Sequence, residues 1–164
     1  MGYGKSHILA ILAGLLSRSG NRTVYVPDCR KLLGDMLSYL QSVFLCAFAD
    51  PSSSHTCDKI RAFKSKEDIY DFCRTQSKPF YFIVDQKNDL EIGGANTDSA
   101  TNSAKLTVQH FLGQITALHY TITSVSANYQ TALHMAKKQV NEKQLAMMGG
   151  MSEVSKHSSR ALIF

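Results

Sequence analysis

The chain has 164 residues, which corresponds to about one domain, and 44% of them are hydrophobic while 19% are charged. This composition supplies enough apolar material for a core and excludes an intrinsically disordered chain, while three Pro and ten Gly exclude a collagen-like or linker-dominated one. The formal net charge of +5 suits a nucleic-acid partner, an anionic small molecule or neither, and is too small to distinguish them.

The first apolar segment predicts a buried helix over residues 5–19, which ends at Gly20 as its C′ glycine. Its apolar run, Ile8–Leu16, is much shorter than the ~20 residues needed to cross a bilayer, so no membrane span is predicted. The run also resembles the hydrophobic region of a signal peptide, and Met1–Ser6 fits the loose myristoylation pattern M-G-x-x-x-S/T. We favour a third interpretation, in which this is a phosphate-binding helix.

The next segment predicts a strand followed by a helix. Residues 23–26 are β-branched or aromatic and predict a short buried strand, which Pro27 and Asp28 end. Asp28 is placed to cap a helix over about residues 30–48, and the polar segment 50–54 breaks this helix. The inner face of the helix is expected to consist of Leu32, Leu33, Met36, Leu37, Leu40, Val43 and Phe44.

The middle of the chain predicts a second helix and a fully buried strand. Ser65 and Asp68 form a capping-box pattern at the start of a helix over residues 66–76. Five consecutive apolar residues, 80–84, follow this helix and lead directly into Asp85. Such a run is typical of a strand buried on both faces, and hence of a parallel sheet with helices on either side.

The last third of the chain predicts a loop, two helices and a strand. The Gly- and Asn-rich segment 93–103 is expected to be a loop, followed by a helix over about 104–117 and a strand over about 118–125. A last helix covers about residues 129–147, and the tail 151–164 is weakly patterned. The alternation of helices and strands predicts an α/β fold with a doubly wound, mostly parallel sheet.

Polar side chains stand at the ends of all three predicted strands, namely Asp28, Asp85 and Asn128. Ligands of such sheets bind outside the carboxyl ends of the strands, so these residues are candidates for a site. An Asp at the end of a buried strand is suited to hold Mg²⁺ beside a phosphate loop. Asn128 suits two roles, which are to sense a γ-phosphate or orient water, and to cap the helix that begins at residue 129.

The residues before the first helix match half of a phosphate-binding motif. Gly4, Lys5 and Ser6 form the second half of G-x-x-x-x-G-K-S/T, in which backbone N–H groups and the amino end of a helix surround the phosphates. In this motif the lysine contacts the β- and γ-phosphates and the hydroxyl binds Mg²⁺. The position of these residues at the start of an apolar helix, with a later strand ending in Asp85, favours a nucleotide site.

Four short strings resemble a known family, the P-loop ATPase domain of Crinkler-type effector proteins of oomycetes and fungi. The strings are Gly2-Tyr3-Gly4-Lys5-Ser6-His7, Val24-Tyr25-Val26-Pro27-Asp28-Cys29-Arg30, Phe82-Ile83-Val84-Asp85-Gln86-x-Asn88-x-Leu90 and Ser124-x-Ser126-Ala127-Asn128. The resemblance covers roughly residues 2–150. It implies a three-layer P-loop NTPase-like sandwich, and ATP and Mg²⁺ held through Lys5, Ser6 and Asp85. It also implies secretion and action inside a host cell, often in its nucleus. The residues of the nucleotide site are then Gly2, Gly4, Lys5, Ser6 and His7.

The sequence departs from this pattern at its amino end. The first Gly of the motif would stand before Met1, and the strand that precedes the phosphate loop is absent. In such folds the missing strand lies at the centre of the sheet, so two neighbours are expected to keep unpaired backbone groups. We therefore expect an incomplete domain over residues 1–150, followed by a tail or the start of the missing remainder over 151–164. The chain is then a piece of a longer protein or an incomplete gene product, and its nucleotide affinity is expected to be weak.

Hydrolysis of the nucleotide is the open point of this interpretation. Gln86 follows Asp85, at a position where many ATPases place the Glu that activates water. A glutamine can orient water but is a poor proton acceptor. Asp89 and Glu91 are candidate substitutes, and the alternative is that both are solvated loop charges. The absence of an N-K-x-D string does not by itself distinguish ATP from GTP.

A second functional hypothesis is a non-catalytic fragment that binds a host protein or a nucleic acid. It depends on the basic residues of the carboxyl end. The alternative is that these residues form a solvated helix face. Retention on DNA that weakens steeply with salt would distinguish the two. The basic residues are Lys137, Lys138, Lys143, Lys156 and Arg160, against Glu142 and Glu153.

The cysteines and histidines give no metal motif. The four Cys, at positions 29, 46, 57 and 73, form no C-x-x-C pair, and reduced thiols are favoured over disulfides. Cys46 and Cys73 fall on predicted helices and are expected to pack as small apolar residues. None of the six His pairs with a helical Glu at metal-binding spacing, and most Tyr and Phe residues are assigned to the core.

Overall fold

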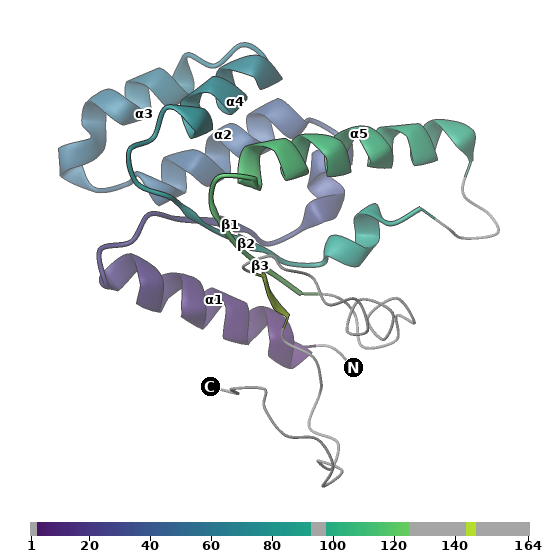
Figure 1. Ribbon diagram of the computed structural model, residues 1–164, viewed down its shortest axis with the longest axis horizontal. Helices are drawn as coiled ribbons and strands as arrows, with labels where there is room; N and C mark the ends of the chain where they lie inside the picture. The colour runs from purple at the N-terminus through teal and green to yellow at the C-terminus, as the bar shows by residue number, and fades with distance from the viewer. Residues whose placement is uncertain (1–2, 93–97, 125–143, 147–164) are drawn as a thin grey trace, which may run out of the picture.

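The structure is a computed structural model that describes residues 3–92, 98–124 and 144–146 (Figure 1). Its sheet contains β1 (Thr23–Val26), β2 (Tyr81–Val84), β3 (Tyr120–Thr123) and β4 (Gln144–Ala146), in the order β1-β2-β3-β4. All three pairings are parallel, which confirms the parallel sheet predicted from the apolar run before Asp85. The pairing aligns Val26 with Val84 and Val84 with Thr123, so the first three strands end at one edge.

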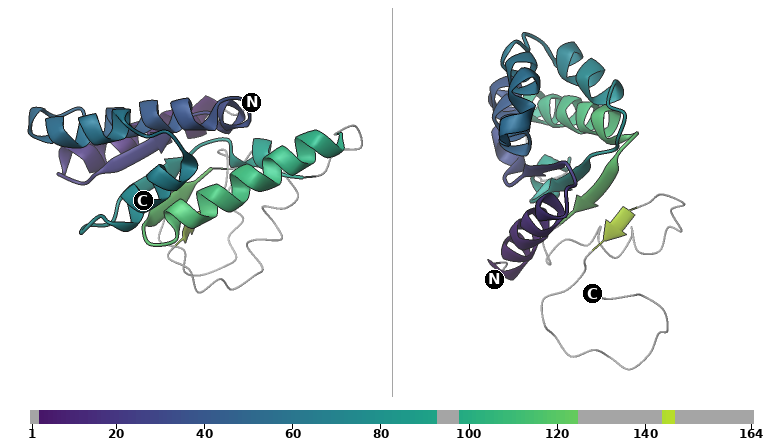
Figure 2. Two further views of the ribbon diagram at one scale, coloured as in Figure 1. Left: turned by 90° about the horizontal axis from the view of Figure 1, so that it is seen from above. Right: turned by 90° about the vertical axis from the view of Figure 1, so that its left-hand side faces the viewer.

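Helices cover both faces of the sheet, as the sequence predicts for an α/β fold. Helix α1 (Tyr3–Arg18) lies on one face. The opposite face carries α2 (Met36–Ala47), α3 (Ser54–Arg61), α4 (Lys66–Arg74) and α5 (Ser99–Thr116), as Figures 1 and 2 show. The connections from β1 to β2 and from β2 to β3 therefore both pass over the face opposite α1.

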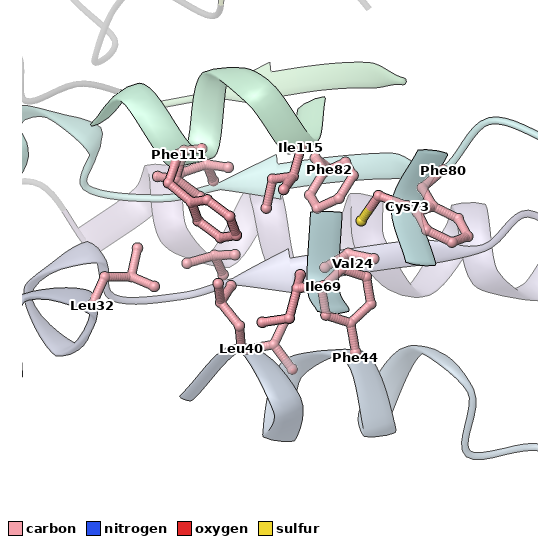
Figure 3. Packing of buried hydrophobic residues seen from close by; sticks show 14 of the residues in the cluster. Val24, Leu32, Leu40, Phe44, Ile69, Cys73, Phe80, Phe82, Phe111 and Ile115 are labelled. Carbon is pink, nitrogen blue, oxygen red and sulfur yellow. The ribbon is translucent and has the colours of Figure 1, made fainter. Parts of the chain in front are cut away.

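An aromatic cluster fills the space between the sheet and these four helices (Figure 3). Phe44 of α2 is fully buried, and its ring lies 5.7 Å from the ring of Phe72 and 6.1 Å from that of Phe82, both edge to face. Ile69 and Cys73 of α4 complete this side of the core. The capping box predicted at Ser65 and Asp68 is confirmed, with both of its hydrogen bonds formed.

Helix α1 differs from the prediction in how much of it is buried. Its end is confirmed: Gly20 has φ +80°, its N–H donates to Ser17 O, and the next N–H, of Asn21, donates to Leu16 O in a Schellman motif. The expected full burial is wrong, because the short strands beneath the helix cover one stripe of it, at Leu9 and Ala13. Three other apolar side chains of the run, those of Ile8, Ile11 and Leu15, are more than half exposed.

The predicted helix over residues 30–48 is wrong as a single element. It is divided into the 3-10 helix η1 (Cys29–Leu33) and α2. Asp28 does cap, but it caps η1, where its side chain accepts from Arg30 N at 3.0 Å. Asp35 caps α2, since its side chain accepts from Ser38 N at 3.0 Å, and this second cap ends the first helix.

Two other regions differ from the sequence predictions. The segment before α4 contains α3, preceded by the 3-10 helix η2 (Pro51–Ser53), where the sequence predicted only a break. Helix α5 begins at Ser99 within the predicted loop 93–103, because the Asp98 side chain accepts from Thr101 N at 2.6 Å.

The predicted helix 129–147 is wrong at residues 144–146, which form β4 instead. Pairing with β3 satisfies the backbone groups of this segment. The loss of a central strand was expected to leave two neighbours with unpaired backbone groups, but the four described strands pair in one continuous order. The rest of that predicted helix, the tail 151–164 and the basic residues named above for the carboxyl end lie outside the described residues.

The four cysteines lie in the described part of the chain and are free thiols. Cys73 is buried as expected, but Cys46 is exposed, because it lies on the outer side of α2. Tyr70 of α4 is likewise exposed rather than in the core. Each helix within the described residues is too short or too polar to cross a bilayer.

His119, just before β3, is expected to make the stability of the fold depend on pH. Its ring lies 4.8 Å from that of Phe80, and its Nδ1 accepts from Phe80 N at 3.3 Å. Burial lowers the pKa of His119 below its ordinary value of 6.5. The unfolded chain therefore takes up a proton at a higher pH than the folded one, and the free energy of unfolding should decrease as the pH falls below about 6.5.

Urea unfolding at pH 7.5 and 5.5 checks this prediction. His119→Gln should reduce the loss of stability at pH 5.5, while the exposed control His110→Gln should retain it. An equal loss in the wild type and in His119→Gln would contradict the assignment to His119.

Candidate functional site

The carboxyl edge of the sheet gathers the loops that follow the first three strands. The loop after β1 continues into η1, and the loop after β2 continues into the 3-10 helix η3 (Lys87–Leu90). Helix α1 runs antiparallel to the strands, so its amino end lies toward this same edge (Figure 1). The topology therefore brings the first turn of α1 and the ends of the strands to one side of the molecule.

Asp85 extends β2 by one residue and is almost completely buried, with 2% exposure. Its N–H donates to Val26 O at 2.9 Å, so the ladder with β1 continues to this residue. Side chains alternate along a strand, and Ile83, two residues earlier, packs under α1 with Leu9. Asp85 therefore lies on the face of the sheet that α1 covers.

The two oxygens of the Asp85 carboxylate differ in their hydrogen bonding. Oδ1 accepts from Gln86 N at 2.8 Å and also from the hydroxyl of Ser124. Oδ2 is buried and has no hydrogen-bond partner among the described residues. An unsatisfied buried oxygen costs about 1–3 kcal/mol when neutral and more when charged. The free oxygen therefore marks a position where a cation or a donor would be stabilising.

Ser124 is a site residue that the sequence analysis named only as the first residue of the family-like string Ser124-x-Ser126-Ala127-Asn128. It follows β3 directly and is 4% exposed. Its N–H donates to Val84 O at 3.0 Å, and its carbonyl accepts from Lys87 N at 3.2 Å. Both backbone groups of Ser124 are thus bound to β2 and the loop that follows it.

Gln86 has the left-handed backbone conformation, with φ 55° and ψ 36°. This conformation is uncommon for a residue other than Gly, and residues that hold it often stand at functional sites. The turn at Gln86 separates the strand from η3 and directs the chain away from the sheet. In this turn the N–H of Gln86 donates a hydrogen bond to Asp85 Oδ1.

Arg30 connects the loops after β1 and β2. Its Nε and Nη2 donate to the two carboxylate oxygens of Asp28 at 3.1 and 3.2 Å, and its Nε lies 3.6 Å from Asp89 Oδ2. The hydrogen bonds from Arg30 lower the pKa of Asp28 below its ordinary value. Asp89 also accepts from Asn88 Nδ2 at 3.1 Å, so this candidate base is held within its own loop.

The pKa of the Cys29 thiol reflects its burial and the charged groups near this edge. Burial, and then the negative charges of Asp89, Asp28 and Asp85, raise the pKa of Cys29 to about 12, so the thiol stays neutral. The second and third family-like strings therefore lie near one another, and the carboxylates of Asp28 and Asp89 there share the guanidinium of Arg30.

The predicted phosphate-binding residues lie at the amino end of α1. Lys5 and Ser6 are half-buried there, while Gly4 and His7 are exposed. The first turn of α1 contains no acidic residue that would neutralise the partial positive charge of the helix end. Gly2 and Asn128 lie outside the described residues.

Two further observations bear on a metal site. The described residues contain no group of three or more His, Cys, Asp or Glu side chains placed to hold a metal ion. Magnesium at nucleotide sites takes one or two carboxylates or hydroxyls from the protein and further oxygens from phosphates and water, and Asp85 and Ser6 are groups of this kind.

Neither a family model, nor a curated protein, nor a solved structure matches the chain.

Proposed function

We propose that the chain binds ATP as its magnesium complex at the carboxyl edge of the sheet, as a P-loop NTPase-like domain. The observation that carries this proposal is the buried Asp85, whose Oδ2 has no hydrogen-bond partner among the residues that the structure describes. A divalent cation would compensate this charge. The resemblance to Crinkler-type effectors favours ATP over other nucleotides and favours a role as an effector.

Each residue of the site has a distinct role in this proposal. Asp85 would hold Mg²⁺ together with the hydroxyl of Ser6, and Lys5 would contact the β- and γ-phosphates. The N–H groups at the start of α1 would bind phosphate oxygens, supported by the helix dipole. Bound Mg²⁺ would neutralise phosphate charge, while the residues of the chain position the nucleotide.

Slow hydrolysis is part of the proposal. The side chain next to the metal-binding carboxylate is that of Gln86, which suits the orientation of water better than the removal of its proton. Asn128 would act at the third strand end, on the γ-phosphate or the attacking water. We therefore propose ATP binding as the main activity and turnover as a weak one.

Titration with a fluorescent ATP analogue tests the proposal. We expect saturable binding that is tightened by Mg²⁺. Lys5→Ala should weaken binding about tenfold or more, equivalent to about 1.4 kcal/mol, through loss of its contact with the phosphates. The control Lys59→Ala, on exposed α3, should have no effect.

Two results would count against this function. Binding that does not saturate at millimolar nucleotide would exclude a nucleotide site, and binding unchanged in Lys5→Ala would place the nucleotide elsewhere.

A further inference from the structure

We infer that Ser124 is a positioning residue for Asp85, and that its hydroxyl fixes the orientation in which the second carboxylate oxygen is offered to the divalent cation. The inference rests on the proposed function, since it concerns the cation of the same site. It is carried by the contact between the Ser124 hydroxyl and Asp85 Oδ1, which links the ends of β3 and β2.

The geometry leaves the carboxylate of Asp85 with two unequal oxygens. Oδ1 accepts from both the Gln86 N–H and the Ser124 hydroxyl, whereas Oδ2 accepts from no described group. A carboxylate held by two donors on one oxygen cannot rotate without breaking both bonds. The second oxygen is therefore the one left for a metal ion, in a fixed orientation.

Ser124 itself is held in place independently of its side chain. Its N–H and C=O groups bond to Val84 and Lys87, and both its side chain and that of Asp85 are buried. Removing the hydroxyl therefore leaves the backbone bonds between the two strand ends intact. What is lost is the second donor to Oδ1, so that the orientation of the carboxylate depends on Gln86 alone.

This role differs from that of a residue that only stabilises the fold. Partners that orient a metal ligand typically change metal affinity by about 10- to 100-fold when they are removed. The effect should fall on the gain in nucleotide affinity produced by Mg²⁺, and not on the affinity measured in EDTA. Ser124→Thr keeps the hydroxyl, whereas Ser124→Ala removes it.

The test compares nucleotide affinity in Mg²⁺ and in EDTA for the full chain and its variants, with thermal unfolding measured for each. We expect Ser124→Ala to lower the ratio of the two affinities about tenfold or more, with the EDTA value unchanged. Ser124→Thr should restore the ratio, and Ser77→Ala, at an exposed position, should not alter it. If the alanine variant does not fold, Ser124→Cys takes its place, because a thiol is a weak donor of similar shape.

The outcomes separate this inference from the proposed function. An unmodified chain that shows no Mg²⁺-dependent nucleotide binding overturns the proposed function, and the inference falls with it. If Ser124→Ala has the same ratio of nucleotide affinity in Mg²⁺ to that in EDTA as the wild type, the role of Ser124 is overturned while the proposed function stands. A folded Ser124→Thr variant that does not recover the ratio also overturns it.

Discussion

Asp85→Asn should abolish the tightening of ATP binding by Mg²⁺ while leaving the fold intact. The amide keeps an oxygen that can accept from Gln86 N and from Ser124, but it removes the negative charge that would hold the cation. The free energy of unfolding should stay the same or increase, because a buried carboxylate with one oxygen that no described group hydrogen-bonds becomes a neutral group. Nucleotide titration with and without Mg²⁺, together with urea unfolding, measures both effects.

The matched control for this variant is Asp71→Asn. Asp71 lies on α4, is exposed, and pairs with Arg74 three residues later, so the same chemical change there should affect neither property. Retention of the full Mg²⁺ effect in Asp85→Asn would remove the central residue from the proposed site. A large loss of stability would instead identify Asp85 as a structural group.

Phe44→Ala should decrease the free energy of unfolding by about 3–5 kcal/mol, the range typical of a fully buried Phe. The ring of Phe44 contacts the rings of Phe72, Phe80 and Phe82 edge to face, so its removal leaves a cavity between α2, α4 and the sheet. Urea unfolding followed by circular dichroism measures the loss. Such a loss would consume a large part of the stability of a small domain.

Leu118→Ala provides the comparison for Phe44→Ala. Leu118 is 68% exposed, so its truncation should change the free energy of unfolding by no more than about 0.5 kcal/mol. A change below about 1 kcal/mol for Phe44→Ala would mean that the aromatic cluster is less tightly packed than its ring contacts indicate.

The features predicted correctly from sequence are those that local residues determine. The apolar run before Asp85 predicted a buried parallel strand, and the Ser65–Asp68 pattern predicted the start of α4, because each signal lies within a few adjacent residues. Asp85 was also predicted to stand at the carboxyl edge, since parallel strands end together. The roles of Lys5 and Ser6 remain predictions.

The features that sequence reasoning missed depend on distant parts of the chain. The apolar pattern of α1 predicted a buried helix, but burial also depends on what covers each face, and the sheet covers one stripe only. Residues 144–146 were predicted as helix because their pairing with β3 is not visible locally. The contact between Ser124 and Asp85 joins residues 39 positions apart, so no spacing rule within one element would find it.

Each strand pairs with the strand that precedes it in the chain, so the sheet can grow from one edge during synthesis. A nascent polypeptide that has emerged as far as Val84 already contains β1, β2 and the rings of Phe44, Phe72 and Phe80. We expect this amino-terminal half to form the folding nucleus while the ribosome is still making β3. The carboxyl edge of the sheet, which includes Ser124, would then form after that nucleus.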